Sequence, residues 1–214
     1  MNDRSVRDHK IEKALNPYDL IATQWRNSRR DLLPREVLYL NELVSKLSDS
    51  AHILDVGCGT GIPIARFILN RGFRLTGLDS SPSMLAIAST EVPEARLLHG
   101  DMVAFDLDER FDAIVAWDCV FHVDRARHAA VFANFAKWLL PGGWLLLSIG
   151  GTAEAGFTSD MHGQTFFYSG HDPAQAAGLL ERAGIKIERM EIDDPSDRGH
   201  VAILAQRKHE SLMD

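Results

Sequence analysis

Short, continuous apolar runs alternate with segments of helical periodicity between residues 49 and 150. The apolar runs, each long enough for one buried strand, are residues 52–56, 73–78, 95–98, 113–117 and 144–149. The helical segments between them are residues 61–70, 82–90 and 125–140, the last followed by the helix-breaking sequence Pro141-Gly142-Gly143. Buried strands that alternate with helices are typical of a parallel sheet covered on both faces, so the pattern predicts a doubly wound α/β fold.

Two amphipathic helices are predicted before this core. The first has apolar side chains at helical spacing, at Tyr18, Ile21, Ala22 and Trp25. The second begins at Pro34, a residue favoured in the first turn of a helix, and continues through Val37, Leu40, Leu43, Val44 and Leu47. We expect these helices to pack on the larger core.

The C-terminal part has a different pattern. Five glycines punctuate a polar segment over residues 150–171 that predicts a long loop, and loops of this length are usually lids or binding loops. A helix is predicted at 173–183, followed by strands at 185–192 and 200–206. The short polar turn between these two strands predicts that they pair antiparallel.

Charge narrows the class of partner. The chain of 214 residues has 23 basic and 30 acidic side chains, a formal net charge of −7. Eight basic and five acidic residues fall in the first 35 positions, so this segment carries +3 and the remainder −10. Because the neutralisation of phosphates supplies most non-specific affinity for nucleic acids, we expect no nucleic-acid partner and favour a small or cationic one.

The sequence predicts a cytoplasmic protein, a monomer or homodimer, that contacts no membrane. Residues 1–13 carry charges where a signal peptide needs an apolar stretch, and no apolar run approaches the ~20 residues of a membrane span. Cys58 and Cys119 are too few for a disulfide framework and lack the paired spacing of a zinc site. We therefore expect reduced thiols and no metal.

The strongest chemical signal is a glycine-rich turn from a strand into a helix, Asp55-x-Gly57-x-Gly59-x-Gly61. Glycines let the backbone bend tightly and let a ligand approach main-chain N–H groups. The spacing differs from the dinucleotide fingerprint G-x-G-x-x-G, because position 62 is Ile. The carboxylate of Asp55 beneath this loop suits a cationic ligand group better than a pyrophosphate.

Two further acids end the next two strands. Asp79 lies at the tip of the second strand, where a carboxylate can accept hydrogen bonds from both hydroxyls of a ribose. Ser80 begins the following helix with capping chemistry, and Met84 in its first turn can rest on a flat purine. Asp101 closes the third strand, where it either accepts from an exocyclic amine or is an ordinary solvated acid. The ligand is therefore predicted to contain a nucleoside.

Five motifs occur in order across about residues 50–150: ILDVGCGTG, LTGLDSSPSML, HGDM, FDAIVAWDCVFHV and LLPGGWLLLSI. In sequence and spacing they resemble the class I S-adenosylmethionine-dependent methyltransferases. The resemblance implies a Rossmann-like, doubly wound seven-stranded α/β sheet, mostly parallel with a C-terminal antiparallel strand, and S-adenosylmethionine as cofactor. It divides the single domain into a helical cap (1–48), a cofactor-binding core (49–150), an acceptor-side lid loop (151–171) and a C-terminal helix with two strands (172–214).

The resemblance also implies roles for the glycine-rich turn. Gly57, Gly59 and Gly61 face the methionine part of the cofactor, and Asp55 lies near its amino group. Cys58 belongs to the same site, where we expect it to act as a small filler.

Roles for the ribose and adenine follow from the next two motifs. By the same resemblance, Asp79 takes the ribose hydroxyls, with Ser80 beside it. Met84 packs on adenine. Asp101, together with the Met102 backbone, reads the adenine edge.

The remaining predicted residues lie near the transferring methyl group. A subset of these enzymes begins with a Y-D-x-x-A-x-x-W helix that folds over the cofactor, matched here by Tyr18 and Trp25. Trp117 follows the fourth strand, a position that borders the methyl group in the family. His122 is the candidate general base, since a neutral imidazole can take a proton from a hydroxyl or amine near neutral pH. The alternative is a structural histidine near the start of the next helix.

The acceptor is predicted to be an O or N centre of a small molecule, with S-adenosylhomocysteine as the second product. Amino-methylating DNA enzymes carry N/D-P-P-Y/F where this chain has the sequence WDCV at 117–120, which disfavours methylation of a base amine. A protein or RNA acceptor, and a nucleoside-binding module without catalysis, are the alternatives.

Three further groups have two interpretations each. The aromatic residues 166–168 either line the acceptor site or seal the lid against the sheet. The arginines that follow the first predicted helix either steer an anionic acceptor or form a solvated face. The late histidines, among them His200, have no metal-ligand spacing and are interpreted as ordinary loop residues.

Overall fold

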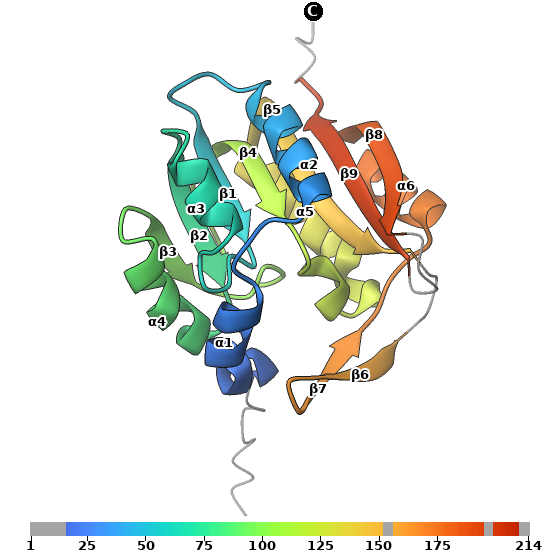
Figure 1. Ribbon diagram of the computed structural model, residues 1–214. Coiled ribbons are helices and arrows are strands. Elements are labelled where there is room, and N and C mark those ends of the chain that lie inside the picture. Colours follow the sequence, from blue (N-terminus) through green and yellow to red (C-terminus); the bar gives the residue numbers. More distant parts are fainter. Residues whose placement is uncertain (1–15, 152–155, 195–198, 210–214) are drawn as a thin grey trace, which may run out of the picture.

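The computed structural model describes residues 16–151, 156–194 and 199–209 (Figure 1). Its helices are α1 (Pro17–Ser28), α2 (Pro34–Val44), α3 (Ile64–Leu69), α4 (Pro82–Glu91), α5 (His128–Trp138) and α6 (Pro173–Arg182), with two 3-10 turns, η1 (Val120–His122) and η2 (Arg125–Arg127). One sheet contains β1 (His52–Val56), β2 (Arg74–Asp79), β3 (Arg96–His99), β4 (Phe111–Ala116), β5 (Leu139–Gly150), β8 (Ile185–Asp194) and β9 (His200–Arg207). A separate two-stranded sheet contains β6 (Phe157–Met161) and β7 (Gln164–Tyr168).

The large sheet has the strand order β3-β2-β1-β4-β5-β9-β8. Strands β1 to β5 pair in parallel, and β9 runs antiparallel to both of its neighbours. This arrangement confirms the predicted seven-stranded α/β fold. The chain winds outward from β1 in one direction and from β4 in the other, and such a switch point between two central strands is where open α/β sheets bind ligands.

Both faces of the sheet are covered, as the apolar runs predict. Alternate strand residues point to opposite faces, so Ile53 packs with α2, α3 and α4, whereas its neighbour Leu54 packs with α5 and α6. Figure 1 shows α2 in front of the sheet and α5 behind it. The two apolar layers hold the carboxyl ends of the parallel strands in fixed positions.

The structure corrects the predicted loop over 151–171. Residues Phe157–Met161 and Gln164–Tyr168 form an antiparallel hairpin that turns at His162 and Gly163, both with left-handed φ angles of 52° and 76°. Its strands have five residues each, and Phe166 is the one buried apolar residue in them, so they lack the continuous buried run by which the core strands are recognised. Residues 152–155, the turn at 195–198 and the charged segment 1–13 lie outside the described residues.

Two predicted helices are shorter than expected. The helix predicted at 61–70 begins only at Ile64, because Gly61 has a left-handed φ of 78°. The helix predicted at 125–140 ends at Trp138, and the next residue, Leu139, already pairs with Phe111 in the sheet. The glycines that mark the end of this helix in the sequence therefore lie in an irregular part of β5.

The helix α1 and the β6–β7 hairpin lie together beyond the carboxyl ends of the parallel strands, at the bottom of Figure 1. Side chains of both elements reach the same cavity, described below. None of the described helices is long and apolar enough to cross a membrane.

Candidate active site

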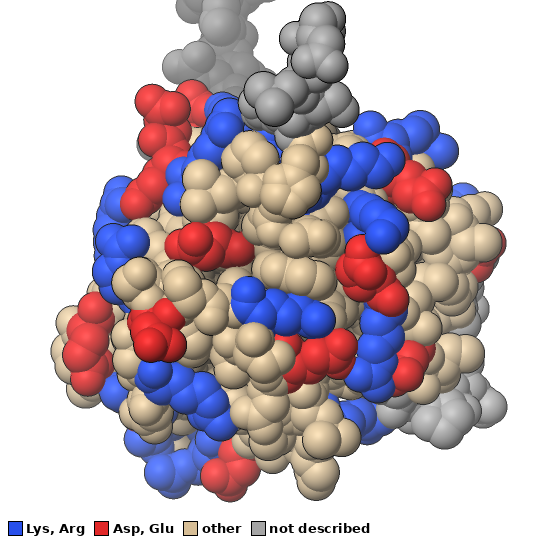
Figure 2. Space-filling view, turned by 90° about the horizontal axis from the view of Figure 1, so that it is seen from above, with Lys and Arg blue, Asp and Glu red and all other residues tan. Residues whose placement is uncertain are grey.

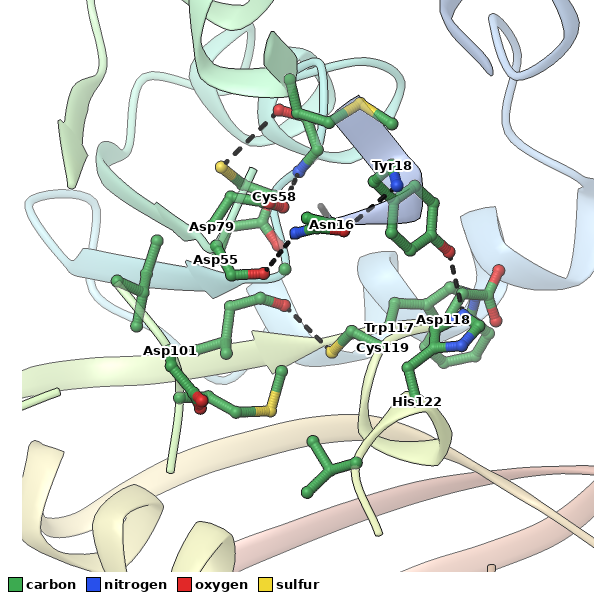
Figure 3. Close-up of a pocket in the computed structure, with 18 of the residues that line it drawn as sticks. Asn16, Tyr18, Asp55, Cys58, Asp79, Asp101, Trp117, Asp118, Cys119 and His122 are labelled. Carbon is green, nitrogen blue, oxygen red and sulfur yellow. Dashed lines mark hydrogen bonds between the residues drawn. The ribbon is translucent and has the colours of Figure 1, made fainter. Parts of the chain in front are cut away.

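A cavity of about 370 Å³ opens at the carboxyl ends of β1, β2 and β4 (Figure 3). The predicted site residues that line it are Tyr18, Trp25, Asp55, Gly57, Cys58, Gly59, Asp79, Ser80, Met84, Asp101, Met102, Trp117 and His122. Figure 3 shows Asp55, Asp79 and Asp101 toward one end of the cavity, and Trp117 and His122 toward the other. The structure thus brings the predicted residues to one place, while their contacts with a cofactor stay predictions.

Gly61 is the one predicted residue that does not line the cavity. A Cβ atom at this position would lie 2.5 Å from Cγ2 of Val92, so the glycine lets the turn pack against the end of α4. Gly57 has the same kind of role on the other side, because a Cβ there would lie 2.5 Å from Cβ of Cys119. Both glycines have left-handed φ angles, 78° and 70°, which residues with a Cβ rarely adopt.

The two cysteines are buried, uncharged parts of the cavity wall. The thiol of Cys119 donates a hydrogen bond to the Val56 carbonyl at 3.2 Å, and Cys58 packs closely against Gly77. Burial raises the pKa of both thiols well above the usual value. Because the thiolate is the reactive form of cysteine, these residues are poor nucleophiles, in agreement with the filler role expected for Cys58.

Asp55 carries a buried carboxyl group with no compensating partner. Its side chain is 3% exposed, and none of the described residues donates a hydrogen bond to it. Burial, followed by the nearby charge of Asp79, raises the pKa of Asp55 to about 8. A carboxylate in this position is stabilised when a cation enters the cavity beside it.

Asp79 is held by main-chain groups of the turns around it. The Gly59 N–H donates to Oδ2 and the Ser81 N–H to Oδ1, both at 2.8 Å. Burial raises the pKa of Asp79 although these backbone hydrogen bonds oppose the shift. Each oxygen keeps a second lone pair, so the carboxylate can accept two more donors from the cavity.

Two methionines line the cavity together with Asp79 and Asp101. Met84 is 1% exposed and lines the cavity at the start of α4, and Met102 lines it from the loop after β3. Asp101 is exposed, and its Oδ1 accepts a hydrogen bond from the Val103 N–H at 2.7 Å. The other carboxylate oxygen of Asp101 has no hydrogen bond from the described residues and can accept one from a ligand.

The helix α1 is fixed along α4 by contacts near both of its ends. Near its start, Asp19 accepts hydrogen bonds from the Ser81 hydroxyl at 2.5 Å and the Ser83 N–H at 3.0 Å. Near its end, Arg26 forms an ion pair of 2.6 Å with Glu91. These contacts hold Tyr18 and Trp25 over the cavity. The anchoring role of Asp19 is not readable from helical periodicity, since it depends on the partner helix.

His122 lies at the opposite end of the cavity from the three acids. Its Nδ1 is 3.0 Å from the carbonyl oxygen of Phe167, which can only accept, so Nδ1 carries the proton. Its Nε2 is therefore an acceptor for the Tyr18 hydroxyl at 2.9 Å. Burial lowers the pKa of His122 from 6.5 and raises that of Tyr18, and the Asp118 carboxylate raises both.

Aromatic rings from three elements surround this pair. Phe166 of the hairpin is 4.8 Å from the Tyr18 ring and 5.8 Å from the His122 ring, between centroids. Tyr168 lies 4.7 Å from the His122 ring. Phe167, by contrast, is 41% exposed. In the aromatic segment 166–168, Phe166 and Phe167 thus line the cavity, and Tyr168 packs against the His122 ring.

The sequence places Asp118 beside Trp117 after the fourth strand but assigns it no role, and the structure shows that it lines the cavity. Its Oδ1 is 2.9 Å from Nε2 of His200 and 3.3 Å from the Ser148 hydroxyl. His200, for which the sequence indicated no special role, begins β9, whose antiparallel direction places this first residue at the carboxyl edge of the parallel strands. The contact between Asp118 and His200 follows from the strand order and not from the sequence pattern, because 82 residues separate the two.

A second missed residue is Arg29, which follows α1 and lines the same end of the cavity. It forms a bidentate ion pair with Glu36, a carboxylate that is 3% exposed and also accepts from Nε1 of Trp117 at 3.0 Å. Arg29 is therefore a half-buried, paired part of the wall and not a solvated charge. No group of three or more His, Cys, Asp or Glu side chains able to hold a metal ion occurs in the described part of the chain.

Comparison with known proteins agrees with this geometry. Residues 53–143 match the family described as "Methyltransferase domain". The chain is 35% identical over 141 residues to a dTDP-3-amino-3,6-dideoxy-alpha-D-glucopyranose N,N-dimethyltransferase of Streptomyces fradiae, which covers 58% of this chain and 55% of that protein. It is 29% identical over 158 residues to a ubiquinone biosynthesis O-methyltransferase of Alkalilimnicola ehrlichii, over 68% of this chain and 60% of that protein. The chain thus spans somewhat more than half the length of these relatives.

Solved structures show the same fold. A crystal structure of an S-adenosylmethionine-dependent methyltransferase from Clostridium acetobutylicum has a TM-score of 0.72 at 15% identity, over 90% of this chain and all of that one. The strand order, the family match over the glycine-rich turn and the three acids at the strand ends point to one conclusion. The chain contains a methyltransferase domain over residues 53–143, and its fold and motif order are similar to those of the class I S-adenosylmethionine-dependent methyltransferases.

Proposed function

We propose that this chain transfers a methyl group from S-adenosylmethionine to an O or N centre of a small molecule. The observation that carries the proposal is the buried, unpartnered carboxyl group of Asp55 in a cavity that it shares with Asp79. A buried carboxylate without a donor is costly, and a ligand with a cationic group removes that cost. The amino group of the cofactor supplies such a cation, so the residues present fit it.

The chain holds the cofactor with groups that are already in position. Asp55 pairs with the amino group, the turn at Gly57 and Gly59 accommodates the methionine part, and Asp79 accepts the ribose hydroxyls. Met84 and Asp101 take the adenine. When bound, S-adenosylmethionine supplies a methyl group activated by its sulfonium. The indole nitrogen of Trp25 lies 3.7 Å from the position of a Cβ at Gly59, so this side chain covers the glycine-rich turn.

At the other end of the cavity, Tyr18 and His122 take up the proton that the acceptor loses. The lowered pKa of His122 keeps its Nε2 unprotonated near neutral pH, and the hydrogen bond to Phe167 fixes the tautomer. A proton that leaves the acceptor reaches Nε2 through the Tyr18 hydroxyl, which accepts one proton while it donates another. The surrounding aromatic rings exclude water from this path.

A small acceptor is favoured over a nucleic acid or a protein. Side chains of α1 and of the hairpin line the cavity, so its volume of about 370 Å³ is bounded by both elements, and cavities of this size suit small molecules. The end of the molecule opposite the cavity, seen in Figure 2, has Lys and Arg interspersed with Asp and Glu and no continuous basic patch. The names of the relatives, a sugar N,N-dimethyltransferase and a ubiquinone O-methyltransferase, also favour a small molecule.

Incubation with S-adenosylmethionine and a broad panel of small alcohols, phenols and amines tests the proposal. We expect release of S-adenosylhomocysteine with at least one acceptor, and a product heavier by one methyl group in the mass spectrum. The His122→Ala variant, with its cavity wall otherwise unchanged, serves as the matched background. Binding of the cofactor without product from any acceptor would instead support the nucleoside-binding module.

A further inference from the structure

Acidic side chains outnumber basic ones in the lining of the cavity. Five aspartates line it, Asp55, Asp79, Asp101, Asp118 and Asp124, against two arginines, Arg29 and Arg127. Arg29 is paired with Glu36 and lies 3.8 Å from Asp118, and Arg127 is exposed. Because Glu36 takes the bidentate contact of Arg29, the charge of Asp118 at the acceptor end is only partly compensated.

We propose that Asp118 binds the methyl acceptor and that this acceptor is a small-molecule amine, which enters as an ammonium ion. The inference rests on the proposed function and narrows its acceptor from an O or N centre to a basic nitrogen. Asp118 acts as the acceptor-binding residue, and His200 as the residue that positions it.

The backbone presents the Asp118 carboxylate at the tip of β4. Its φ of 54° is left-handed, a conformation that aspartate tolerates better than most residues, and its N–H donates to the Ser148 hydroxyl at 2.8 Å. The turn redirects the chain from β4 into η1. Figure 3 shows the side chain at the same end of the cavity as Tyr18 and His122.

Only one of the two carboxylate oxygens is used by the protein. Oδ1 accepts from His200 and Ser148, whereas Oδ2 has no hydrogen bond from the described residues and lies 3.8 Å from Arg29 Nη2. The guanidinium of Arg29 is engaged by Glu36 and cannot approach further. A donor on the acceptor can therefore bind Oδ2 directly, and a charged donor forms the stronger hydrogen bond.

An ammonium fits this end better than an alcohol or a carboxylate. A hydroxyl can donate to Oδ2 but brings no positive charge beside it, and an anion is repelled by it. The neutral His122 then accepts one N–H proton of the ammonium by way of Tyr18. The electron pair of that N–H bond stays on nitrogen and becomes the lone pair that it needs as a nucleophile.

His200 fixes which oxygen faces the cavity. It does not line the cavity itself, and its ring packs 5.3 Å from the Trp117 ring behind the strand ends. Because Nε2 holds Oδ1, Oδ2 is left toward the acceptor. A glutamine at position 200 can supply the same N–H donor, whereas an alanine cannot.

Matched probes separate the charge of the acceptor from its shape. We would saturate the wild-type protein with S-adenosylhomocysteine and measure binding of benzylamine, benzyl alcohol and benzoate, and of cyclohexylamine and cyclohexanol, by ligand-observed NMR. The same measurements use Asp118→Asn, His200→Ala and His200→Gln. Asp106→Asn is the charge control, because Asp106 is exposed and pairs with Lys137 outside the cavity.

We expect the amines to bind in preference to the matched alcohols and benzoate. Their affinity should fall at least tenfold in Asp118→Asn and several-fold in His200→Ala, recover in His200→Gln and stay unchanged in Asp106→Asn. Equal amine binding by Asp118→Asn, preference for an alcohol or benzoate, or binding of none of the amines overturns the proposal. Affinity for S-adenosylhomocysteine, measured separately by calorimetry, should be equal in all these proteins, and its absence in the wild type refutes the proposed function instead.

Discussion

The Tyr18 hydroxyl donates a hydrogen bond of 2.9 Å to Nε2 of His122, between residues that are 104 positions apart in the chain. On the other side of the imidazole, the Phe167 carbonyl accepts from Nδ1. The histidine is therefore held between α1 and the hairpin, the two elements that bound the cavity. The hydrogen bond that Tyr18 donates to the proposed base therefore depends on α1 being docked over the cavity.

His122 should titrate at an unusually low pH. Its pKa is lowered from 6.5 chiefly by burial, so the neutral form persists as pH falls through the range in which an exposed histidine becomes charged. In an NMR titration of the ring protons, assigned with His122→Ala, the midpoint should lie below 6.5. A midpoint at or above this value would show that the imidazole is solvated in solution.

Removal of this imidazole should affect turnover and not cofactor binding. General acid–base groups contribute about 10²–10⁴-fold to rate, so His122→Ala should lower kcat by roughly 10²-fold while the affinity for S-adenosylhomocysteine changes little. Tyr18→Phe retains the ring but not the hydroxyl, and should lower kcat by a smaller factor. Steady-state kinetics with the acceptor found in the panel gives both values. Full activity in His122→Ala would exclude the residue from the reaction.

Cofactor binding should release a proton from Asp55. The pKa of about 8 lies above the ordinary 3.8, so this carboxyl group is mostly protonated at pH 7 in the ligand-free protein. A cation beside it favours the carboxylate, so up to one proton leaves as the ligand binds, and affinity rises as pH increases from 6 to 8. Calorimetry in two buffers of different ionisation enthalpy measures the released protons. Asp55→Asn should show less release, and equal release in both proteins would contradict the assignment.

The contacts of Asp19 should control the closure of α1. Asp19→Ala removes hydrogen bonds to Ser81 and Ser83, and we expect faster amide exchange throughout α1 with roughly tenfold weaker binding of S-adenosylhomocysteine, equivalent to about 1.4 kcal/mol. Arg26→Ala breaks only a partly exposed ion pair with Glu91, and exposed pairs contribute about 0.2–1 kcal/mol. Similar exchange in wild type and Asp19→Ala, measured by mass spectrometry, would show that α1 is held by other contacts.

Local sequence patterns were sufficient for the cofactor end of the cavity. Asp55, Asp79 and Asp101 each follow or end an apolar run, and in a parallel sheet such positions meet at one edge. Their neighbourhood could therefore be predicted from motif order alone. The position of Gly61 could not, since its contact with Val92 depends on how α4 packs.

The acceptor end depends on contacts between distant segments. The pair Asp118–His200 requires that β9 lies beside β5, and neither residue belongs to a periodic pattern that predicts the other. The hairpin was interpreted as a loop because its strands have little apolar surface to bury. Arg29 looked like a surface charge, since its partner Glu36 is in another helix. The contacts proposed for the acceptor thus rest on features that only the folded chain reveals.

The central claim, that the cavity binds S-adenosylmethionine, is tested most directly by calorimetric titration with S-adenosylhomocysteine. The wild-type protein and the exposed-site control Asp106→Ala should bind one equivalent with equal affinity. Asp79→Ala, which removes the carboxylate assigned to the ribose hydroxyls, should bind more weakly by roughly 1.5–3 kcal/mol. Equal affinity in all three proteins, or no binding to the wild type, would contradict the account.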